Sequence, residues 1–348
     1  TPASELLHEL SRLKNFNVIT LQAEDEIAAA GIALGASFAG NLGVTGTSGP
    51  GMDLKAEMMG LAVMLELPMV IVDVQRAGPS TGMPTKTEQG DLLLALFGRH
   101  GESPMPVVAA KSPAHCFDAA IEATRIAVTF RTPVIVLSDT FLANSSEPWL
   151  IPDIADLPTF EPNFATGPNA GTEFMPYLRD ENFAPPWAIP GTPGLRHRVG
   201  GLEKDESGSI SYDADNHQRM TDLRAAKVDR VADGIPPLEV DDPDGDAELL
   251  VLGWGSSYGS IQAAVRRVRE TGRKVATAHL VHLNPFPRNT GEVVGKYRKV
   301  LIPEMNTGQL AMLVRARYLV DVRSYSKVQG MPFYAEELET EMLKVMDE

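Results

Sequence analysis

The chain has 348 residues, a length that fits two domains. Its formal net charge of −15 argues against a nucleic-acid-binding protein, which needs a basic face. Cys116 is the single cysteine, which excludes a disulfide within the chain and an iron–sulfur cluster held by this chain alone. No apolar run reaches the roughly 20 residues of a membrane span, and we expect a cytoplasmic protein.

Residues 1–140 alternate short apolar runs with helical patterns, which predicts a parallel sheet covered by helices. The runs are rich in Val and Ile without alternation, as in strands that are buried on both faces. The predicted strands are 17–21 (NVITL), 69–74 (MVIVDV), 106–110 (PVVAA) and 133–139 (PVIVLSD). The predicted helices are 25–39, 53–66, 88–98 and 113–130.

The middle of the chain differs in composition. Residues 143–246 are rich in Pro, Gly and charge and contain one plausible helix, about 213–232. Alternation returns after the acidic DDPDGD, with strands in ELLVLGW, KVATAHL and KVLIPEM. We therefore expect a first α/β domain over 1–145, an irregular connecting region over 146–246, and a second α/β domain over 247–348.

Two glycine-rich stretches are similar in composition to nucleotide-binding loops, but neither matches a nucleotide-binding motif. TGTSGPGMD, residues 45–53, matches neither GxGxxG nor the phosphate-loop pattern, and we expect a tight turn into the following helix. LGWGSSYG, residues 252–259, lacks the ribose-binding acid after the next strand, so a helix-packing turn is favoured. The seven histidines show no metal-ligand spacing, and we expect no metal site within this chain.

The stretch QRAGPSTGMPTKTEQGDL, residues 75–92, follows a predicted buried strand. It places one arginine and several hydroxyls where parallel sheets bind ligands, at the carboxyl end of a strand. At the chain start, Thr1 and Pro2 are typical of a helix cap, and a helix start can also bind an anion. In QAEDEIAAAGIALGASFAG, residues 22–40, an acidic cluster precedes small residues that allow close approach to a helix. Those acids are either dipole complements or include one used for proton chemistry.

These stretches in this order resemble a known family. TPAS, QAEDEIAAAGIALGASFAG, TSGPG and RAGPSTGMPTKTEQGDL, followed by PWAIPGTPGL, GGLEKDE, DNHQRM and PEMNTGQL, are similar to the alpha subunit of the 2-oxoacid:ferredoxin oxidoreductases. The 2-oxoglutarate type is the most similar. The given sequence starts at TP, without the glycine-tyrosine-proline-isoleucine that usually precedes it in the family, and we expect the gamma domain that some alpha chains carry either to be a separate subunit or to have been cut off.

The resemblance implies a thiamine pyrimidine-binding-like domain followed by a transketolase C-terminal-like domain, with the connecting region near the active site. It implies thiamine diphosphate, Mg²⁺ and an iron–sulfur cluster as cofactors. A beta subunit would hold the cluster, Mg²⁺ and the diphosphate in an (alpha beta)2 assembly. Coenzyme A and ferredoxin would be the co-substrate and the electron acceptor.

The resemblance also assigns site residues. Glu26 matches the glutamate that contacts the thiamine pyrimidine, with Glu24 as the second choice. Arg76 and Thr1 match substrate contacts, and Thr85 is a further candidate. A guanidinium suits this role because it pairs with a carboxylate through two parallel hydrogen bonds.

The implied reaction is oxidative decarboxylation of 2-oxoglutarate with coenzyme A to succinyl-CoA and CO₂, with the reverse direction left open. A second substrate carboxylate needs another cation, for which Arg179, Arg196, Arg198 or a beta-subunit residue are candidates. Two alternatives remain: another substrate, such as pyruvate or a branched-chain or indole 2-oxoacid, and a non-catalytic scaffold subunit.

Overall fold

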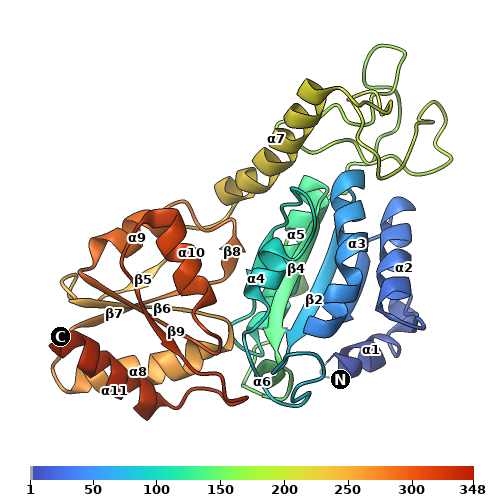
Figure 1. Ribbon diagram of the computed structural model, residues 1–348. Helices are drawn as coiled ribbons and strands as arrows, with labels where there is room; N and C mark the ends of the chain where they lie inside the picture. The colour runs from blue at the N-terminus through green and yellow to red at the C-terminus, as the bar shows by residue number, and fades with distance from the viewer. Residues whose placement is uncertain (1–2) are drawn as a thin grey trace.

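The computed structural model describes residues 3–348 and contains two α/β units, each with its own five-stranded sheet (Figure 1). The first sheet has the order β1-β2-β4-β3-β8 and the second has the order β10-β9-β6-β7-β5. Neighbouring strands are parallel except at β8 and β5, which pair antiparallel at one edge of each sheet. The predicted α/β class with two parallel-dominated sheets is confirmed. No helix within residues 3–348 combines the length and the hydrophobicity needed to cross a bilayer.

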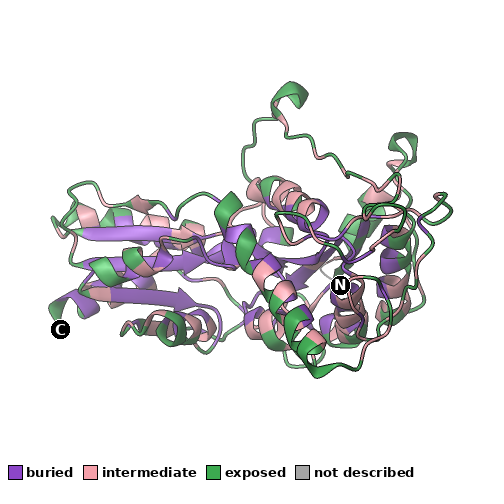
Figure 2. Ribbon diagram, turned by 90° about the horizontal axis from the view of Figure 1, so that it is seen from above, coloured by how far each residue is buried: buried purple, intermediate pink, exposed green. Residues whose placement is uncertain are grey.

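Buried strands flanked by helices build the first unit, with exposed residues on the outer faces of the helices (Figure 2). Its strands are β1 (Gly43–Thr47), β2 (Met69–Gln75), β3 (Val107–Ala109) and β4 (Pro133–Asp139). Its helices are α1 (Ser4–Leu10), α2 (Glu26–Phe38), α3 (Gly49–Leu65), α4 (Leu92–Phe97), α5 (His115–Phe130) and α6 (Thr140–Ala143).

The second unit follows helix α7 (Ala214–Arg230). Its strands are β5 (Val240–Asp241), β6 (Leu249–Trp254), β7 (Val275–Leu280), β9 (Lys299–Glu304) and β10 (Arg323–Ser326). Its helices are α8 (Tyr258–Glu270), α9 (Thr290–Lys296), α10 (Gln309–Tyr318) and α11 (Ala335–Asp347). Strand β8 (His282–Asn284) leaves this part of the chain and pairs with β3 of the first sheet.

One predicted strand is wrong. NVITL, residues 17–21, lies outside both sheets, and Ile19 in it is 93% exposed. The first strand is instead β1, whose sequence GVTGT has weak strand propensity. Gly43 is required there, because a Cβ at this position would lie 2.0 Å from the carbonyl oxygen of Ala33. Close packing of α2 on β1 therefore requires small residues in β1, and these residues do not give the apolar run by which a strand is recognised in a sequence.

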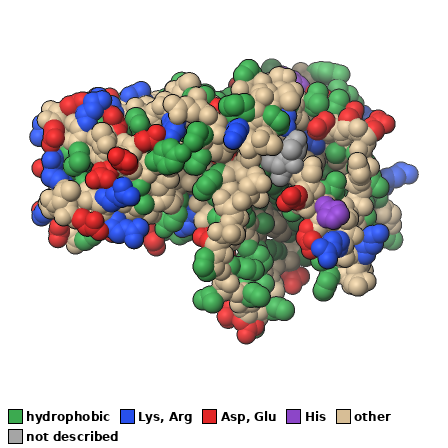
Figure 3. All heavy atoms as spheres, turned by 90° about the horizontal axis from the view of Figure 1, so that it is seen from below, with side chains coloured by type: hydrophobic (Ala, Val, Ile, Leu, Met, Phe, Trp, Pro, Cys, Tyr) green, Lys and Arg blue, Asp and Glu red, His purple; other side chains and the backbone are tan. Residues whose placement is uncertain are grey.

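Residues 144–162 form an arm that extends from the body, visible in Figure 2 and, on the face seen in Figure 3, as a projection with hydrophobic side chains along it. Leu150, Ile151 and Ile154 on this arm are more than four-fifths exposed. The arm contains four acidic residues and no basic ones. It is tied to the body where Glu147 accepts a hydrogen bond of 2.6 Å from the backbone of Ala114.

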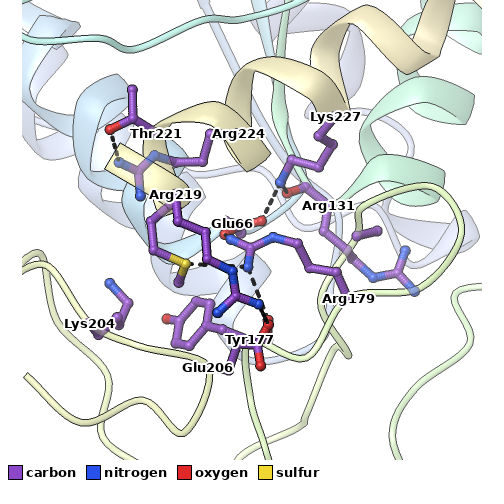
Figure 4. Close-up of polar contacts among 12 residues, drawn as sticks. Glu66, Arg131, Tyr177, Arg179, Lys204, Glu206, Arg219, Thr221, Arg224 and Lys227 are labelled. Carbon is purple, nitrogen blue, oxygen red and sulfur yellow. Dashed lines mark hydrogen bonds and ion pairs between the residues drawn. The ribbon is translucent and has the colours of Figure 1, made fainter. Parts of the chain in front are cut away.

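A charged cluster fastens the rest of the middle region to the first unit (Figure 4). Glu66, which caps the end of α3, is an ion-pair partner of both Arg179 and Lys227, and its distance to the Lys227 Nζ is 2.6 Å. Lys227 also donates to the carbonyl of Arg131, just before β4. The side chains of Glu66, Arg179 and Lys227 are at most 5% exposed. The cluster therefore lies at the amino-terminal ends of β2 and β4.

Candidate active site

The site residues predicted from the sequence gather where β1 and β2 end and where α2 and α3 begin. Glu26 is the first residue of α2, and its side chain is half-buried. It lies over Gly51 in the first turn of α3, where a Cβ would come within 2.8 Å of the Glu26 Cγ and 2.0 Å of the Thr47 Oγ1. Gly51 in TSGPG thus makes room for Glu26. No residue within 3–348 donates a hydrogen bond to the Glu26 carboxylate, which leaves it available to a ligand.

Lys55 of α3 lies beneath Glu26 and was not identified from the sequence. It is fully buried, and its Nζ donates to the Glu26 carbonyl at 3.1 Å and to the Thr45 hydroxyl at 3.0 Å. Burial lowers the pKa of Lys55, and the nearby carboxylates of Glu26 and Asp25 oppose that change. Lys55 therefore fixes the start of α2 against β1. Its place two residues after the SGPGMD turn is the sequence signal that could have identified it.

The second-choice acid, Glu24, is exposed and precedes α2. Asp25 is the N-cap of α2 and accepts a hydrogen bond of 2.7 Å from the Ala28 backbone. The three neighbouring acids therefore have different environments. Only Glu26 combines partial burial with contact to the glycine turn of α3.

Arg76 follows β2 directly and is half-buried. Its Nε is buried and has no hydrogen-bond partner among residues 3–348. A buried guanidinium nitrogen without an acceptor is costly unless a ligand supplies one. Thr85, at the outer part of the same loop, is exposed. Thr1 lies outside the described residues, although Ala3 approaches β1, 3.8 Å from the place of a Cβ on Gly46.

The loop after Arg76 folds back on itself. The Ala77 backbone donates to the Lys86 carbonyl and the Met83 backbone donates to the Ala77 carbonyl, both at 2.9 Å. Gly82 has φ +46°, and a Cβ there would lie 2.1 Å from the Ala77 carbonyl oxygen, so glycine is required. The loop is therefore a compact turn that keeps Arg76 at its base and exposes its hydroxyl-bearing outer part.

Two neighbouring carboxyl groups, one fully buried and one half-buried, lie next to this loop, and the sequence did not suggest their pairing. Asp73 of β2 is fully buried, and neither of its oxygens has a hydrogen-bond donor in residues 3–348. Burial raises the pKa of Asp73 well above its ordinary value, and the neighbouring Asp91 raises it further. Burial also raises the pKa of Asp91, to about 6. The Asp91 carboxylate packs on Gly49, where a Cβ would lie 2.8 Å from both of its oxygens. Both changes have the same direction and favour the protonated form of the two carboxyl groups.

The loop ends against the second unit. Gln89, fully buried, contacts the ends of β6 and β9, and Gln309 at the start of α10 donates to the Gly90 carbonyl at 2.7 Å. The motifs KTEQGD and PEMNTGQL, about 220 residues apart, are therefore in direct contact. Gly255 in the LGWGSSYG turn has φ +58°, and a Cβ there would lie 2.7 Å from the Gln89 Nε2, so this glycine packs on the Arg76 loop.

The proposed second cations lie elsewhere. Arg179 is buried against Glu66 and is not available to a substrate, so this candidate is wrong within the chain as described. Arg196 and Arg198 are exposed in the middle region, where Ile189 packs on Gly40 after the carboxyl end of α2. That region adjoins the end of the first unit opposite the Arg76 loop (Figure 1).

Comparison with known proteins agrees with this arrangement. Residues 1–221 match the thiamine diphosphate-binding domain of the pyruvate flavodoxin/ferredoxin oxidoreductases, and residues 247–338 match core domain II of pyruvate:ferredoxin oxidoreductase. The chain belongs to the 2-oxoacid:ferredoxin oxidoreductase family. The family inferred from the sequence motifs is thus confirmed.

Individual relatives of this family carry 2-oxoglutarate in their names. The chain is 60% identical to the 2-oxoglutarate oxidoreductase subunit KorA of Mycobacterium tuberculosis, over 97% of this chain and 51% of that protein. It is 35% identical to the 2-oxoglutarate synthase subunit KorA of Archaeoglobus fulgidus, over 89% of this chain and 82% of the relative. The chain thus spans about half the length of its mycobacterial relative.

Solved structures extend the comparison to three dimensions. The 2-oxoglutarate:ferredoxin oxidoreductase of Magnetococcus marinus, with 2-oxoglutarate, coenzyme A and succinyl-CoA bound, matches with a TM-score of 0.94 and 37% identity, over 99% of this chain and 60% of that one. A split gene transketolase matches with a TM-score of 0.51 and 11% identity, over 95% of this chain and 84% of that one, and shares the fold alone.

Proposed function

We propose that this chain is the alpha subunit of a 2-oxoglutarate:ferredoxin oxidoreductase that is active together with a beta subunit. The observation that carries the proposal is the placement of Glu26 and Arg76 at one edge of the first sheet, each with polar atoms that lack partners within residues 3–348. The names of the relatives and the ligands of the Magnetococcus structure support 2-oxoglutarate as the substrate.

The residues at this edge fit thiamine diphosphate. A carboxyl group that packs on a glycine turn and has no hydrogen-bond donor among residues 3–348 suits contact with the aminopyrimidine ring. Thiamine diphosphate, when bound, supplies an electron sink for decarboxylation of a 2-oxoacid. Residues of a beta subunit would hold its diphosphate, Mg²⁺ and the iron–sulfur cluster, since Cys116 is the single cysteine here.

Glu26 would hold a proton between its carboxyl oxygen and the ring nitrogen N1′, which favours the imino form of the aminopyrimidine. Lys55 keeps the first turn of α2 in place while that proton moves. Arg76 would bind the carboxylate next to the keto group and place its oxygens against the unpaired Nε. Because Arg179 is occupied by Glu66, we propose that the partner subunit provides the cation for the second carboxylate of 2-oxoglutarate.

The proposed net reaction balances when ferredoxin accepts the electrons. 2-Oxoglutarate and the thiol of coenzyme A give succinyl-CoA, CO₂, a proton and two electrons, as the carbon–carbon bond to the carboxylate breaks and a thioester bond forms. An iron–sulfur cluster held by the beta subunit would supply the electron transfer, with ferredoxin as the acceptor. We propose an (alpha beta)2 assembly that works in the cytoplasm and can include a gamma domain or subunit.

The test is activity of the chain purified together with its beta subunit. Reduction of a dye is measured in the presence of coenzyme A with 2-oxoglutarate, pyruvate, a branched-chain 2-oxoacid and indolepyruvate, each with and without coenzyme A. We expect coenzyme A-dependent reduction with 2-oxoglutarate and much slower reduction with the others. Faster turnover of pyruvate would overturn the substrate and retain the reaction class. Equal activity after Glu26→Gln would favour a scaffold role for this chain.

A further inference from the structure

The carboxyl end of the Arg76 loop is held by the second unit, with Gln89 at the centre of the contact. Gln89 donates from its Nε2 to the Trp254 carbonyl at 2.9 Å and accepts from the Met305 backbone at 3.0 Å. Its own backbone N–H donates to the Met305 carbonyl at 3.0 Å. Asn306 donates to the Gln89 carbonyl at 2.9 Å. Side chain and backbone of this fully buried residue are therefore both bonded to the ends of β6 and β9.

Two further contacts extend this junction. Gln309 accepts from the Leu93 backbone at 3.0 Å in addition to its bond to Gly90. Gly330 of the second unit packs on the loop itself, since a Cβ there would lie 2.6 Å from the Met83 Cε and 2.9 Å from the Lys86 Cβ. The second unit thus contacts both the end and the outer part of the loop.

The amino end of the loop is anchored to the first sheet. Gln75 donates to the Ser138 carbonyl at 3.0 Å and accepts from the Asp91 backbone at 3.1 Å. Glu88 accepts from the Gly78 backbone at 2.9 Å. These bonds link residues at both ends of a compact turn, so a short chain of contacts connects position 89 to the base of the loop, where Arg76 lies.

We propose that Gln89 is a positioning residue for the 2-oxoacid site, and that through it the second unit sets the position of Arg76. The uncharged amide gives this role a physical reason. It supplies one donor and one acceptor to backbone groups without placing a charge beside a site that must bind a carboxylate. The expected effect of Gln89 on the kinetics with 2-oxoglutarate rests on the proposed function. The expected effect on the position of the loop, which we call the mechanical part, does not.

A merely structural role for Gln89 must be distinguished from positioning. Asn289 offers a matched control, because its side chain makes the same kind of two-bond contact, at 2.7 and 3.0 Å, with the backbone of Leu238. This clamp joins two parts of the second unit and does not touch the loop. Asn289→Ala should therefore lower stability without changing the loop.

The experiment compares Gln89→Ala, Gln309→Ala and Asn289→Ala in the assembled enzyme. Amide hydrogen exchange is measured over residues 76–91, and KM is measured for 2-oxoglutarate and for coenzyme A. We expect faster exchange in the loop for Gln89→Ala and Gln309→Ala, with kcat/KM for 2-oxoglutarate lowered about 10- to 100-fold in Gln89→Ala and less in Gln309→Ala. The KM for coenzyme A should stay within about 2-fold, and Asn289→Ala should match the wild type in both loop exchange and KM.

Two results would overturn the inference. One is unchanged loop exchange in both glutamine variants, which needs no substrate and is independent of the proposed function. The other is a rise in the KM for 2-oxoglutarate in Asn289→Ala equal to that in Gln89→Ala. If Gln89→Ala fails to assemble, Gln309→Ala decides, because Gln309 is only partly buried and leaves the Gln89 contacts intact. Absence of turnover with every 2-oxoacid in the wild type would count against the proposed function, and the exchange comparison would still decide the mechanical part.

Discussion

The two ends of the first sheet are joined to the rest of the chain by different chemistry. At the amino ends of β2 and β4, buried ion pairs among Glu66, Arg179 and Lys227 hold the middle region. At the carboxyl end, uncharged amides of Gln89 and Gln309 hold the loop against the second unit. Among residues 3–348, three ionisable groups at that end, Asp73, Arg76 and Asp91, each have a buried polar side-chain atom without a hydrogen-bond partner.

The use of charged contacts at one end of the sheet and uncharged contacts at the other follows from the role of the groups at each end. A buried charge is stabilised only when an opposite charge and hydrogen bonds compensate it, and Glu66 supplies most of that compensation for Arg179 and Lys227, although the Arg179 Nε has no partner among residues 3–348. At the carboxyl end such compensation would occupy the groups that we propose bind a charged ligand. The described residues therefore use charge for stability at one end, and we propose that charge at the other end serves binding.

The largest effect should come from Glu26→Gln. An amide cannot hold the proton at the ring nitrogen, so kcat should fall about 10²- to 10⁴-fold while the free energy of unfolding changes little. Glu24→Gln is the matched control, since Glu24 is exposed and precedes α2. Steady-state turnover with 2-oxoglutarate measures both variants, and equal losses would remove the distinction between these two acids.

Glu66→Gln should act on stability instead. It leaves Arg179 and Lys227 buried without a countercharge, and the free energy of unfolding should fall by about 3–5 kcal/mol at neutral pH. Glu206→Gln removes one partner of the exposed pair with Arg219 and should cost less than about 1 kcal/mol. Chemical denaturation of the assembled enzyme gives both values. Similar losses in the two variants would contradict the assigned role of the buried cluster.

Arg76→Lys should have a smaller kinetic effect. Lysine keeps the charge and loses the bidentate geometry, so kcat/KM for 2-oxoglutarate should fall about 10- to 100-fold, mostly through KM. The KM for coenzyme A serves as the internal control and should not change. An unchanged KM for the 2-oxoacid would place the substrate carboxylate elsewhere.

Asp91→Asn should give the smallest effect, and that effect depends on pH. The folded chain raises the pKa of Asp91 from 3.8 to about 6, chiefly by burial, so the wild type loses stability as the pH rises through that range. The variant lacks this loss and should gain about 1–3 kcal/mol relative to the wild type between pH 4 and 7. Glu57→Gln, on the exposed side of α3, should show little of this dependence. If the difference in free energy of unfolding between Asp91→Asn and the wild type stayed constant across this pH range, the raised pKa of Asp91 would be excluded.

Many of the strands and helices could be predicted from the sequence, because a buried strand appears in the sequence as a short run of apolar residues. MVIVDV, PVIVLSD and KVLIPEM each correspond to a strand, and helices α3 and α5 were expected within a few residues of their ends. Strand β1 was missed because tight packing selected glycine and threonine there. Strand β8 was missed because three residues pairing with a distant strand leave no periodic pattern.

The candidate site was predictable where a motif supplied the role and not where three-dimensional contact did. Glu26 and Arg76 were found through the resemblance, and their roles remain predictions. Lys55, Asp73 and Asp91 are common residue types whose burial and pairing appear only when β2, α3 and α4 come together. The contact between Gln89 and Met305 joins positions about 216 residues apart, which no local pattern indicates.

The most direct test of the central contrast is the activity of Glu26→Gln and Glu66→Gln assemblies, measured side by side with 2-oxoglutarate and coenzyme A at a temperature where both are folded. We predict that the turnover rate of Glu26→Gln falls at least about 100-fold, whereas the rate of Glu66→Gln stays within about 3-fold of the wild type. A comparable loss in both variants, or full activity of Glu26→Gln, would contradict the separation of binding charge from stabilising charge.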